Sequence, residues 1–532
     1  MSQVIRGFAK TFRRFFAPEE ISTGAKVTRN VLFSILRSAL VWPIPFFLIP
    51  FILGKIGTRG YGTWAVFLTI INLTSLADFG LGGTLTKHVA EHYAKRDFVA
   101  LKRLLDTGIM LYLALASITV FVLGLCSGLL VPLLFRGGAG IADQRLLTLW
   151  HWLLLVEAIN ILVIPLYSAI TGLQRMDLSN FLSSFNSLAF ALLAVLFLRL
   201  DTNLEALLYA ASLTAILTLL IGVGMVWMIL PEIHINPLQF DVSEMKNIFT
   251  FSLQIYVTQT AFIIQNQIEK LYLAWFASVT PVGWYNVAAE AALRIRRIPE
   301  LLLAPIMAAA SELHALRDDD RLGELYYRAH KYLALFGVPL VAYVAVASKR
   351  LVALWLGPRL MMIAVPFAVL SVANFFNLTS GPGLLILIGR GNLRPGIYAA
   401  SLGILVNLVV SFILIYFYGF SGAVIGTSLA ITVGTTYFLY VFNKASASGW
   451  RRPILRAYLK PVVCAAILVA LLLAIYPPEA VSWLGLFVAG IIFVCAYLMG
   501  LITMRFFDQF DLAKAERLFP PIRLVRRVIP VA

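Results

Sequence analysis

Apolar segments recur along this chain from near its start to near its end. Each holds about 20 mostly apolar residues, the length that crosses the hydrocarbon core of a bilayer as an α-helix. Helices are expected throughout, because an open chain cannot leave backbone hydrogen-bonding groups unpaired in lipid. The pattern predicts an all-α membrane protein with about fourteen transmembrane helices, at residues 31–53, 62–81, 107–134, 147–170, 181–200, 204–230, 248–276, 282–310, 332–347, 362–388, 396–418, 422–442, 457–476 and 481–504.

Composition supports a membrane protein over a soluble one. Of the 532 residues, 60% are hydrophobic and only 13% are charged, whereas soluble globular chains carry roughly 25% charged residues. The net charge is +17, and the Lys and Arg residues lie mainly between apolar segments, where anionic lipids attract them. We therefore expect no nucleic-acid partner. The three cysteines lie far apart within apolar segments, so neither a disulfide framework nor a zinc site is predicted.

Basic residues are concentrated in alternate loops. The segments before the first predicted helix and after the second, eighth, twelfth and fourteenth are rich in Lys and Arg. The loops between helices seven and eight, eleven and twelve, and thirteen and fourteen contain no Lys or Arg. Because cytoplasmic loops carry the excess of basic residues, both termini are predicted to face the cytoplasm.

One stretch of the chain occurs twice. Residues 62–104 match residues 283–325 without a gap, with nine identities in 43 positions. The polar part of the match reads Glu-x-x-Ala-x-Arg-Asp-x-x-x-Leu-x-x-Leu, from Glu91 in one copy and from Glu312 in the other. Chance similarity of two apolar segments would explain the Leu and Val matches but not this polar run. Six predicted helices separate the copies, so they share one orientation, as in a parallel internal repeat.

The repeat predicts two lobes of six helices each and an appendage of two. The predicted parts are a basic cytoplasmic segment, a first lobe with helices one to six, a cytoplasmic linker, a second lobe with helices seven to twelve, helices thirteen and fourteen, and a basic cytoplasmic tail. Their boundaries are 1–30, 31–230, 231–247, 248–442, 443–504 and 505–532.

Ionisable residues inside the predicted helices are the candidate functional residues. A charge at the bilayer centre costs at least about 2.5–3.5 kcal/mol and normally faces water or a partner. The seventh predicted helix contains Glu269 and Lys270. In the eighth, Glu290, Arg294 and Arg297 stand at i, i+4 and i+7, which places them on one helical face. A row of cations with one acid suits an anionic substrate, so Lys270, Arg294 and Arg297 are predicted to bind substrate.

Simpler interpretations of these charges remain open. Glu290 can pair with Arg294, or Glu269 with Lys270, only to hold helices together. If the eighth helix starts later than predicted, Arg294 and Arg297 lie at its edge and extend toward the headgroups. Glu269 and Glu290 are therefore expected to be either coupling acids or structural acids.

The first lobe contributes two further candidates. Arg37 lies deep enough in the first predicted helix to need a cavity or a partner, and we expect it to bind substrate with the other cations. Asp78 lies near the end of the second predicted helix, before Phe79-Gly80-Leu81. It can accept bonds from a neighbouring helix, which we favour, or take a coupling proton.

Motifs of soluble enzymes are absent. The glycines between Gly54 and Gly60 form neither a phosphate-binding loop nor a dinucleotide fingerprint, and the six histidines include no His-Glu-x-x-His pair. We therefore predict no enzymatic activity, no metal site and no cofactor; a coupling ion, H⁺ or Na⁺, is left open.

Several motifs in order resemble one transporter family. They are Gly57-x-x-Gly60-Tyr61-Gly62, Leu76-Ala-Asp78-Phe79-Gly80-Leu81, Gln267-Ile-Glu269-Lys270-Leu271 and Val282-Gly283-Trp284-Tyr285-Asn286-x-Ala288. With the six-plus-six-plus-two arrangement, they resemble the polysaccharide transporters of the multidrug/oligosaccharidyl-lipid/polysaccharide (MOP) exporter superfamily. The chain departs at Glu269, where relatives often carry Asp before the Lys.

This resemblance implies a flippase of the bacterial inner membrane. Its implied substrate is an undecaprenyl-pyrophosphate-linked oligosaccharide for O-antigen or exopolysaccharide assembly, carried by alternating access between two lobes. Membrane lipids, a polysaccharide polymerase and chain-length proteins are the implied partners. Alternatives are another transporter of the superfamily, either a lipid II flippase or a cation-coupled multidrug exporter, and a membrane enzyme of the same pathway. An excess of buried cations argues against an exporter of cationic drugs, and short loops argue against a polymerase or ligase.

Overall fold

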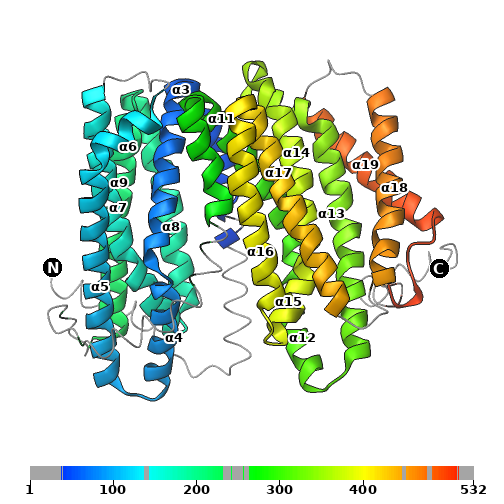
Figure 1. Cartoon of the computed structure of the whole chain (residues 1–532), viewed down its shortest axis with the longest axis horizontal. Coiled ribbons are helices and arrows are strands. Elements are labelled where there is room, and N and C mark those ends of the chain that lie inside the picture. Colours follow the sequence, from blue (N-terminus) through cyan, green and yellow to red (C-terminus); the bar gives the residue numbers. More distant parts are fainter. Residues whose placement is uncertain are drawn as a thin grey trace, which may run out of the picture. The chain divides into compact units, whose positions relative to one another are not determined.

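The computed structural model describes residues 37–38, 40–136, 143–231, 263–445, 451–475 and 482–511, with isolated positions at 236, 241, 256, 260 and 513. Within these residues every regular element is a helix, which confirms the predicted all-α class (Figure 1). Ten stretches of described helix are long and apolar enough to cross a membrane. The chain divides into two compact units, a first unit of residues 1–267 and 278–280 and a second unit of residues 268–277 and 281–532.

The first unit is a bundle built around one central helix. Its elements are α3 (Ile44–Thr74), η1 (Ser75–Asp78), α4 (Leu81–Ala94), α5 (Phe98–Leu125), α6 (Ser127–Leu134), α7 (Asp143–Gly172), α8 (Met176–Leu200) and α9 (Leu204–Ile229). Helix α7 packs against α4, α5 and α9, which run beside it (Figure 1). Gly172 permits the close approach of α4, since a Cβ there would lie 2.6 Å from the carbonyl oxygen of Thr86.

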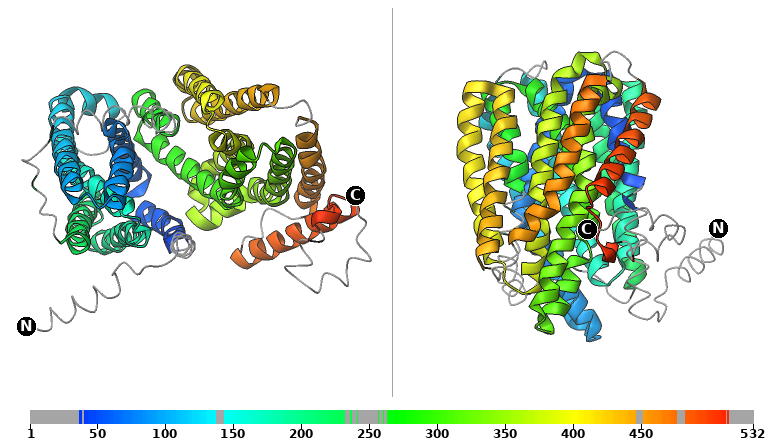
Figure 2. Two further views of the ribbon diagram at one scale, coloured as in Figure 1. Left: turned by 90° about the horizontal axis from the view of Figure 1, so that it is seen from below. Right: turned by 90° about the vertical axis from the view of Figure 1, so that its right-hand side faces the viewer.

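The second unit holds the remaining helices. They are α11 (Val279–Glu300), η2 (Leu301–Leu303), α12 (Ile306–Ala315), α13 (Asp319–Leu356), η3 (Pro358–Ile363), α14 (Ala364–Leu378), α15 (Gly381–Gly389), α16 (Arg394–Val406), the π-helical turn η4 (Asn407–Ser411), α17 (Phe412–Ala445), α18 (Arg451–Ile475) and α19 (Trp483–Thr503). A further helical stretch, 263–276, precedes α11. Helices α18 and α19 pack against α13 (Figure 2).

Two of the ten apolar stretches are each divided by a break at a glycine. The stretches Ile44–Asp78 and Arg394–Lys444 contain 35 and 51 residues, roughly 50 and 75 Å of helix at 1.5 Å per residue, whereas the hydrocarbon core is about 30 Å thick. Each breaks at a glycine with positive φ, Gly57 (+70°) and Gly419 (+52°). These breaks lie between the first and second and between the eleventh and twelfth predicted helices.

The structure corrects three predicted helices. The third begins at Phe98, well before residue 107, and breaks after Leu125. The eighth is interrupted after Glu300 by a 3₁₀ turn and Pro305. The ninth, predicted as 332–347, is the middle of the 38-residue α13. The first turns of α13 are rich in charged residues, so the apolar pattern does not show where this helix begins. Part of the seventh predicted helix and the start of the first lie outside the described residues, so the count of fourteen stays a prediction.

The repeated polar run folds the same way in both units. Arg96 and Arg317 both have φ of +55°. The N–H of Asp97 donates to His92 O and that of Asp318 to Leu313 O, at 3.0 Å in each case. Each aspartate then caps the following helix, because Asp97 accepts from the N–H of Ala100 (2.9 Å) and Asp318 from that of Arg321 (3.0 Å). The shared sequence thus encodes one helix-turn-helix corner, used twice.

The same helix end recurs at three other corners. Gln174, Gly391 and Arg505 have positive φ, and in each case the next residue donates its N–H to a carbonyl five positions back. An Arg in the left-handed region costs roughly 1–2 kcal/mol, and glycine would avoid that cost. The chain nevertheless carries arginine at positions 96, 317 and 505. This agrees with the excess of basic residues that the charge pattern predicts for these loops.

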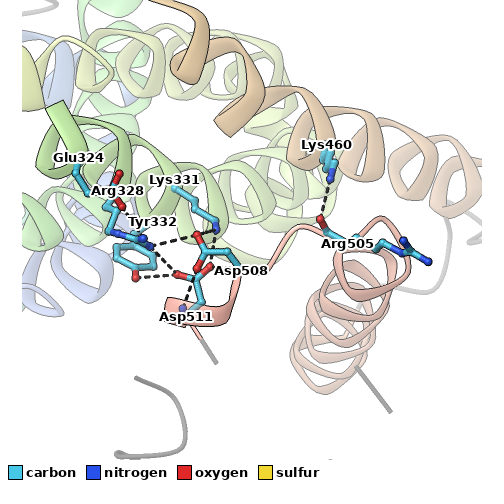
Figure 3. A network of polar contacts seen from close by, with 8 residues as sticks. All are labelled: Glu324, Arg328, Lys331, Tyr332, Lys460, Arg505, Asp508 and Asp511. Atoms are coloured by element: carbon cyan, nitrogen blue, oxygen red, sulfur yellow. Dashed lines mark hydrogen bonds and ion pairs between the residues drawn. The ribbon is translucent and has the colours of Figure 1, made fainter. Parts of the chain in front are cut away.

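The chain after α19 is held on α13 by a network of ion pairs (Figure 3). Lys331 Nζ contacts Asp511 Oδ2 at 2.5 Å and Asp508 Oδ2 at 3.0 Å, and only 2% of the Lys331 side chain is exposed. Arg328 reaches the same two aspartates at 3.3 and 3.4 Å and stacks on the ring of Phe510. We call these residues the tail clasp. It fixes the end of the last helix pair to the second unit.

Both corner caps should stabilise the protein. We expect Asp97→Ala and Asp318→Ala each to cost about 1 kcal/mol, because each leaves a helix-start N–H without its acceptor. The exposed Asp320→Ala, in the first turn of α13, is the control and should cost only a few tenths. Unfolding midpoints of the purified protein measure this, and equal effects of Asp318→Ala and Asp320→Ala would contradict the cap assignment.

The tail clasp should not open between pH 5 and 8. Partial burial raises the pKa of Asp508, but the Asp511 N–H, Lys331 and Arg328 together lower that pKa to about 2. Its stabilising contribution is complete above about pH 4 and is lost as the pH falls toward 2. Proteolysis of the tail should be equally slow at pH 5 and pH 8 in the native protein and faster in Lys331→Met. A clasp that opens already at pH 5 would contradict this.

Candidate functional site

Glu269 lies at the centre of the second unit. It stands in the helical stretch 263–276 and is fully buried. Asn407 Nδ2 donates to Glu269 Oε1 at 2.5 Å, and Thr427 Oγ1 lies 2.6 Å from the same oxygen. Tyr285 of α11 completes the group through its hydroxyl, 2.7 Å from Thr427 Oγ1. Three helical elements, η4, α17 and α11, therefore supply neutral hydrogen-bonding groups around one buried acid.

The π-helical turn explains how α16 and α17 reach this acid. It spans Asn407–Ser411, and a π-helical turn shifts side-chain directions and often occurs at functional sites. Gly426 lets Ser411 pack closely, since a Cβ at 426 would lie 2.5 Å from Ser411 Oγ. Three buried oxygens here, Glu269 Oε2, Asn407 Oδ1 and Ser411 Oγ, have no hydrogen-bond partner among the described residues. Oxygen atoms of this kind can hold a proton or a small hard cation.

Lys270 and the charged face of α11 form the cationic part of the candidate site. Lys270 is buried and interacts electrostatically with Glu290 and, more weakly, with Glu269. Arg294 Nη2 lies 3.7 Å from Glu290 Oε2, and both side chains are about one third exposed. Arg297, one turn further along α11, is exposed. The structure thus brings Lys270, Glu290 and Arg294 together, with Arg297 on the same helical face.

The two first-lobe candidates lie in the other unit. Arg37 is helical and exposed. Asp78 ends η1 and accepts hydrogen bonds from the hydroxyl of Tyr112 and from the N–H of Gly82. These bonds tie the end of η1 to α5 and to the start of α4, which is the helix-to-helix contact favoured from the sequence. The role of Asp78 in coupling stays a prediction.

Sequence reasoning missed a buried acid in the first unit. Glu157 lies within α7, and only 6% of its surface is exposed. Its position inside the fourth predicted helix was signal enough, because every ionisable residue at membrane depth is a candidate. The neutral partners Asn407, Thr427 and Tyr285 could not be found this way, since polar uncharged residues are common in transmembrane helices.

A family model now sets this geometry in context. The model described as "Polysaccharide biosynthesis protein" matches residues 27–311, more than half of the chain. The chain belongs to this family. The match covers the first unit and continues through α11 and most of α12, so it includes Glu269, Lys270 and the charged face of α11. No curated protein matches the sequence.

Solved structures of transporters share the fold of this family member. A lipid II flippase, MurJ, in an inward closed conformation aligns with 88% of this chain and 98% of its own, at a TM-score of 0.71 and 15% identity. An inward-facing multidrug resistance MATE transporter of the MOP superfamily aligns with 78% of this chain and 99% of its own, at a TM-score of 0.62 and 15% identity. The MOP superfamily predicted from the sequence is thereby confirmed.

Charge balance around Lys270 should govern stability of the second unit. Lys270→Met leaves the buried Glu269 without a nearby cation, so we expect it to lower the stability measurably. The double variant Glu269→Gln/Lys270→Met removes both charges and should recover most of that loss. The exposed Lys349→Met is the control and should have little effect. Thermal unfolding in detergent measures all four proteins; additive losses in the double variant would show that the two charges are independent.

Proposed function

We propose that this protein is a flippase that carries an oligosaccharide linked to undecaprenyl pyrophosphate across the bacterial inner membrane. The family supports a place in polysaccharide biosynthesis, and the fold supports transport through a membrane. The sugar and pyrophosphate cross through the protein by alternating access of the two lobes while the lipid tail stays in the bilayer. The product serves O-antigen or exopolysaccharide assembly, and a polymerase with chain-length proteins receives it. Under this proposal the protein is a transporter and catalyses no covalent reaction.

The charged face of α11 is the observation that carries this proposal. A half-exposed ion pair at i, i+4 contributes only about 0.3–0.5 kcal/mol, whereas a guanidinium facing hydrocarbon costs at least about 2.5 kcal/mol. The Glu290–Arg294 ion pair by itself therefore does not offset that cost. A solvated cavity with an anionic ligand accounts for Arg294 and Arg297, because forked N–H donors match phosphate oxygens. Lys270 adds positive charge for the same group, and Arg37 of the first unit is proposed as a further substrate-binding cation.

We further propose that Glu269 binds the coupling cation, H⁺ or Na⁺. Its support is the buried carboxylate with unpartnered oxygens of Asn407 and Ser411 beside it. Lys270 is the next residue, so the charge state at Glu269 acts directly on a cation of the proposed substrate site. A cation bound on one side of the membrane and released on the other would bias the lobes between two states.

A lipid II flippase is the second candidate function. It is favoured by the alignment of 88% of this chain with MurJ. Competition distinguishes the two: lipid-linked oligosaccharide should be transported in proteoliposomes and lipid II should not inhibit it strongly. In cells, deletion of the gene should leave lipid-linked repeat units on the cytoplasmic side. Unchanged delivery to the outer side would refute the flippase.

Arg294→Ala should lower transport about 10- to 100-fold, the loss expected when a charged hydrogen bond of about 1.5–3 kcal/mol disappears. Arg294→Lys should fall between, since it keeps the charge but not the forked donors. The exposed Arg359→Ala is the matched control and should transport normally. Rates in proteoliposomes are compared at equal protein content. If Arg294→Ala loses protein and transport in equal proportion, the residue is structural.

A further inference from the structure

Glu157 is a buried acid near the middle of α7 in the first unit. It is 14 residues from the start of α7 and 15 from its end, roughly 21 Å of helix either way. Its carboxyl group contacts Thr74 Oγ1 at 2.6 Å and Asn160 Nδ2 at 3.3 Å. Neither partner is charged. An ionised carboxylate here would have two neutral neighbours and no cation, which is costly at the middle of a membrane helix.

Among the described residues, the surrounding elements bring no cation to this carboxyl. Helix α7 packs against α3, α4, α5, α6, α8 and α9. The charged residues and histidines described in these elements lie toward helix ends or beside the Gly57 break, and none is among the groups that act on Glu157: Lys55, Arg59, Lys87, His88, Glu91, His92, Lys102, Arg103, Asp106, Asp177, Arg199 and Glu205. On α7 itself, Asp143, Arg145 and His151 lie nearer its start and Tyr167 nearer its end. Asp78 of η1 is bonded to Tyr112 and Gly82.

Counting hydrogens around Thr74 indicates where a proton sits. Thr74 Oγ1 also lies 2.7 Å from the carbonyl oxygen of Ile71. A threonine hydroxyl has one hydrogen to donate, and a carbonyl can only accept, so Thr74 cannot donate to both Ile71 and a carboxylate. A protonated Glu157 satisfies every contact: it donates to Thr74, Thr74 donates to Ile71, and Asn160 donates to the other carboxyl oxygen.

Thr74 connects this proton to a break in the helix. It is the last residue of α3, followed by the 3₁₀ turn η1 and by Phe79 and Gly80, both with positive φ. If Glu157 loses its proton to water, the Thr74 hydroxyl must turn toward the carboxylate and abandon Ile71. The last turn of α3 then loses a bond beside the point where the helix changes direction, a site where small changes in hydrogen bonding alter helix angles.

We propose that Glu157 is a proton-binding site whose occupancy sets the geometry of the break between α3 and α4. Loss of the proton turns the Thr74 hydroxyl away from Ile71, so the last turn of α3 loses a hydrogen bond. Binding of the proton restores that bond. The proton site stands on the contacts of Glu157, while its effect on transport rests on the proposed flippase function. The first unit then has its own protonation site, separate from Glu269.

Infrared difference spectroscopy on the full-length purified protein tests the proton site without any substrate. At neutral pH we expect a carboxylic-acid C=O band that disappears in Glu157→Gln and persists in Glu269→Gln. Thr74→Val should shift this band, because the acid loses its acceptor, whereas Thr74→Ser should leave it in place. The Thr74 pair keeps the test valid if Glu157→Gln does not fold. Absence of any band sensitive to Glu157 or Thr74 at neutral pH would overturn the proposal.

Transport in proteoliposomes tests the consequence. Glu157→Gln mimics the protonated acid, so its transport rate should depend less on pH than that of the native protein. If the infrared band is present but Glu157→Gln keeps the native pH dependence, the proton does not control the break during transport, and that part of the proposal is wrong. If the native protein moves no lipid-linked oligosaccharide at all, the proposed function fails while the infrared result for Glu157 still stands.

Discussion

Every polar group in the membrane part of this protein must find its partner within the chain or in a wetted site, because lipid offers none. This constraint explains the buried groups of both units. Glu269 has Asn407 and Thr427, Asp78 has Tyr112, and the tail clasp gives Lys331 two carboxylates. The charged face of α11 differs from these groups, because Arg294 and Glu290 are 3.7 Å apart and each is about one third exposed. Exposed charge within a membrane helix is where a ligand is expected.

The repeat and its departures have separate roles. Both copies build the same corner, with an arginine in the left-handed region and an aspartate cap, so the shared residues are those that turn the chain. The acids do not follow the repeat: a shift of 221 residues takes Glu157 to Leu378 and Glu269 to Leu48. The two units thus share the geometry of this corner, whereas their buried carboxyls do not correspond in the repeat.

Sequence reasoning reached the fold because apolar length is a strong local signal. The structure and the family match confirmed the helical class and the superfamily that it predicted. The polar repeat marked two corners that the structure shows to be alike. Sequence reasoning failed where helices break, since Cys126 and the 3₁₀ turn after Glu300 depend on packing rather than on composition. It found Glu269 and Lys270 as charges at membrane depth but passed over Glu157. Asn407 and Thr427 were beyond its reach, because only a fold brings residues 138 and 158 positions away to Glu269.

The buried acids of the two units share one hydrogen-bonding arrangement, although their positions do not correspond in the repeat. Each carboxyl lies 2.6 Å from a threonine hydroxyl that also lies within 2.8 Å of a carbonyl oxygen of its own helix, Ile71 for Thr74 and Ala423 for Thr427. One hydroxyl hydrogen cannot serve both acceptors, so in each unit the charge on the acid competes with a backbone bond. Under the proposed function, a change in occupancy at the carboxyl would therefore become a change in a helix, which is the physical link that alternating access requires between a bound ion and a moving lobe.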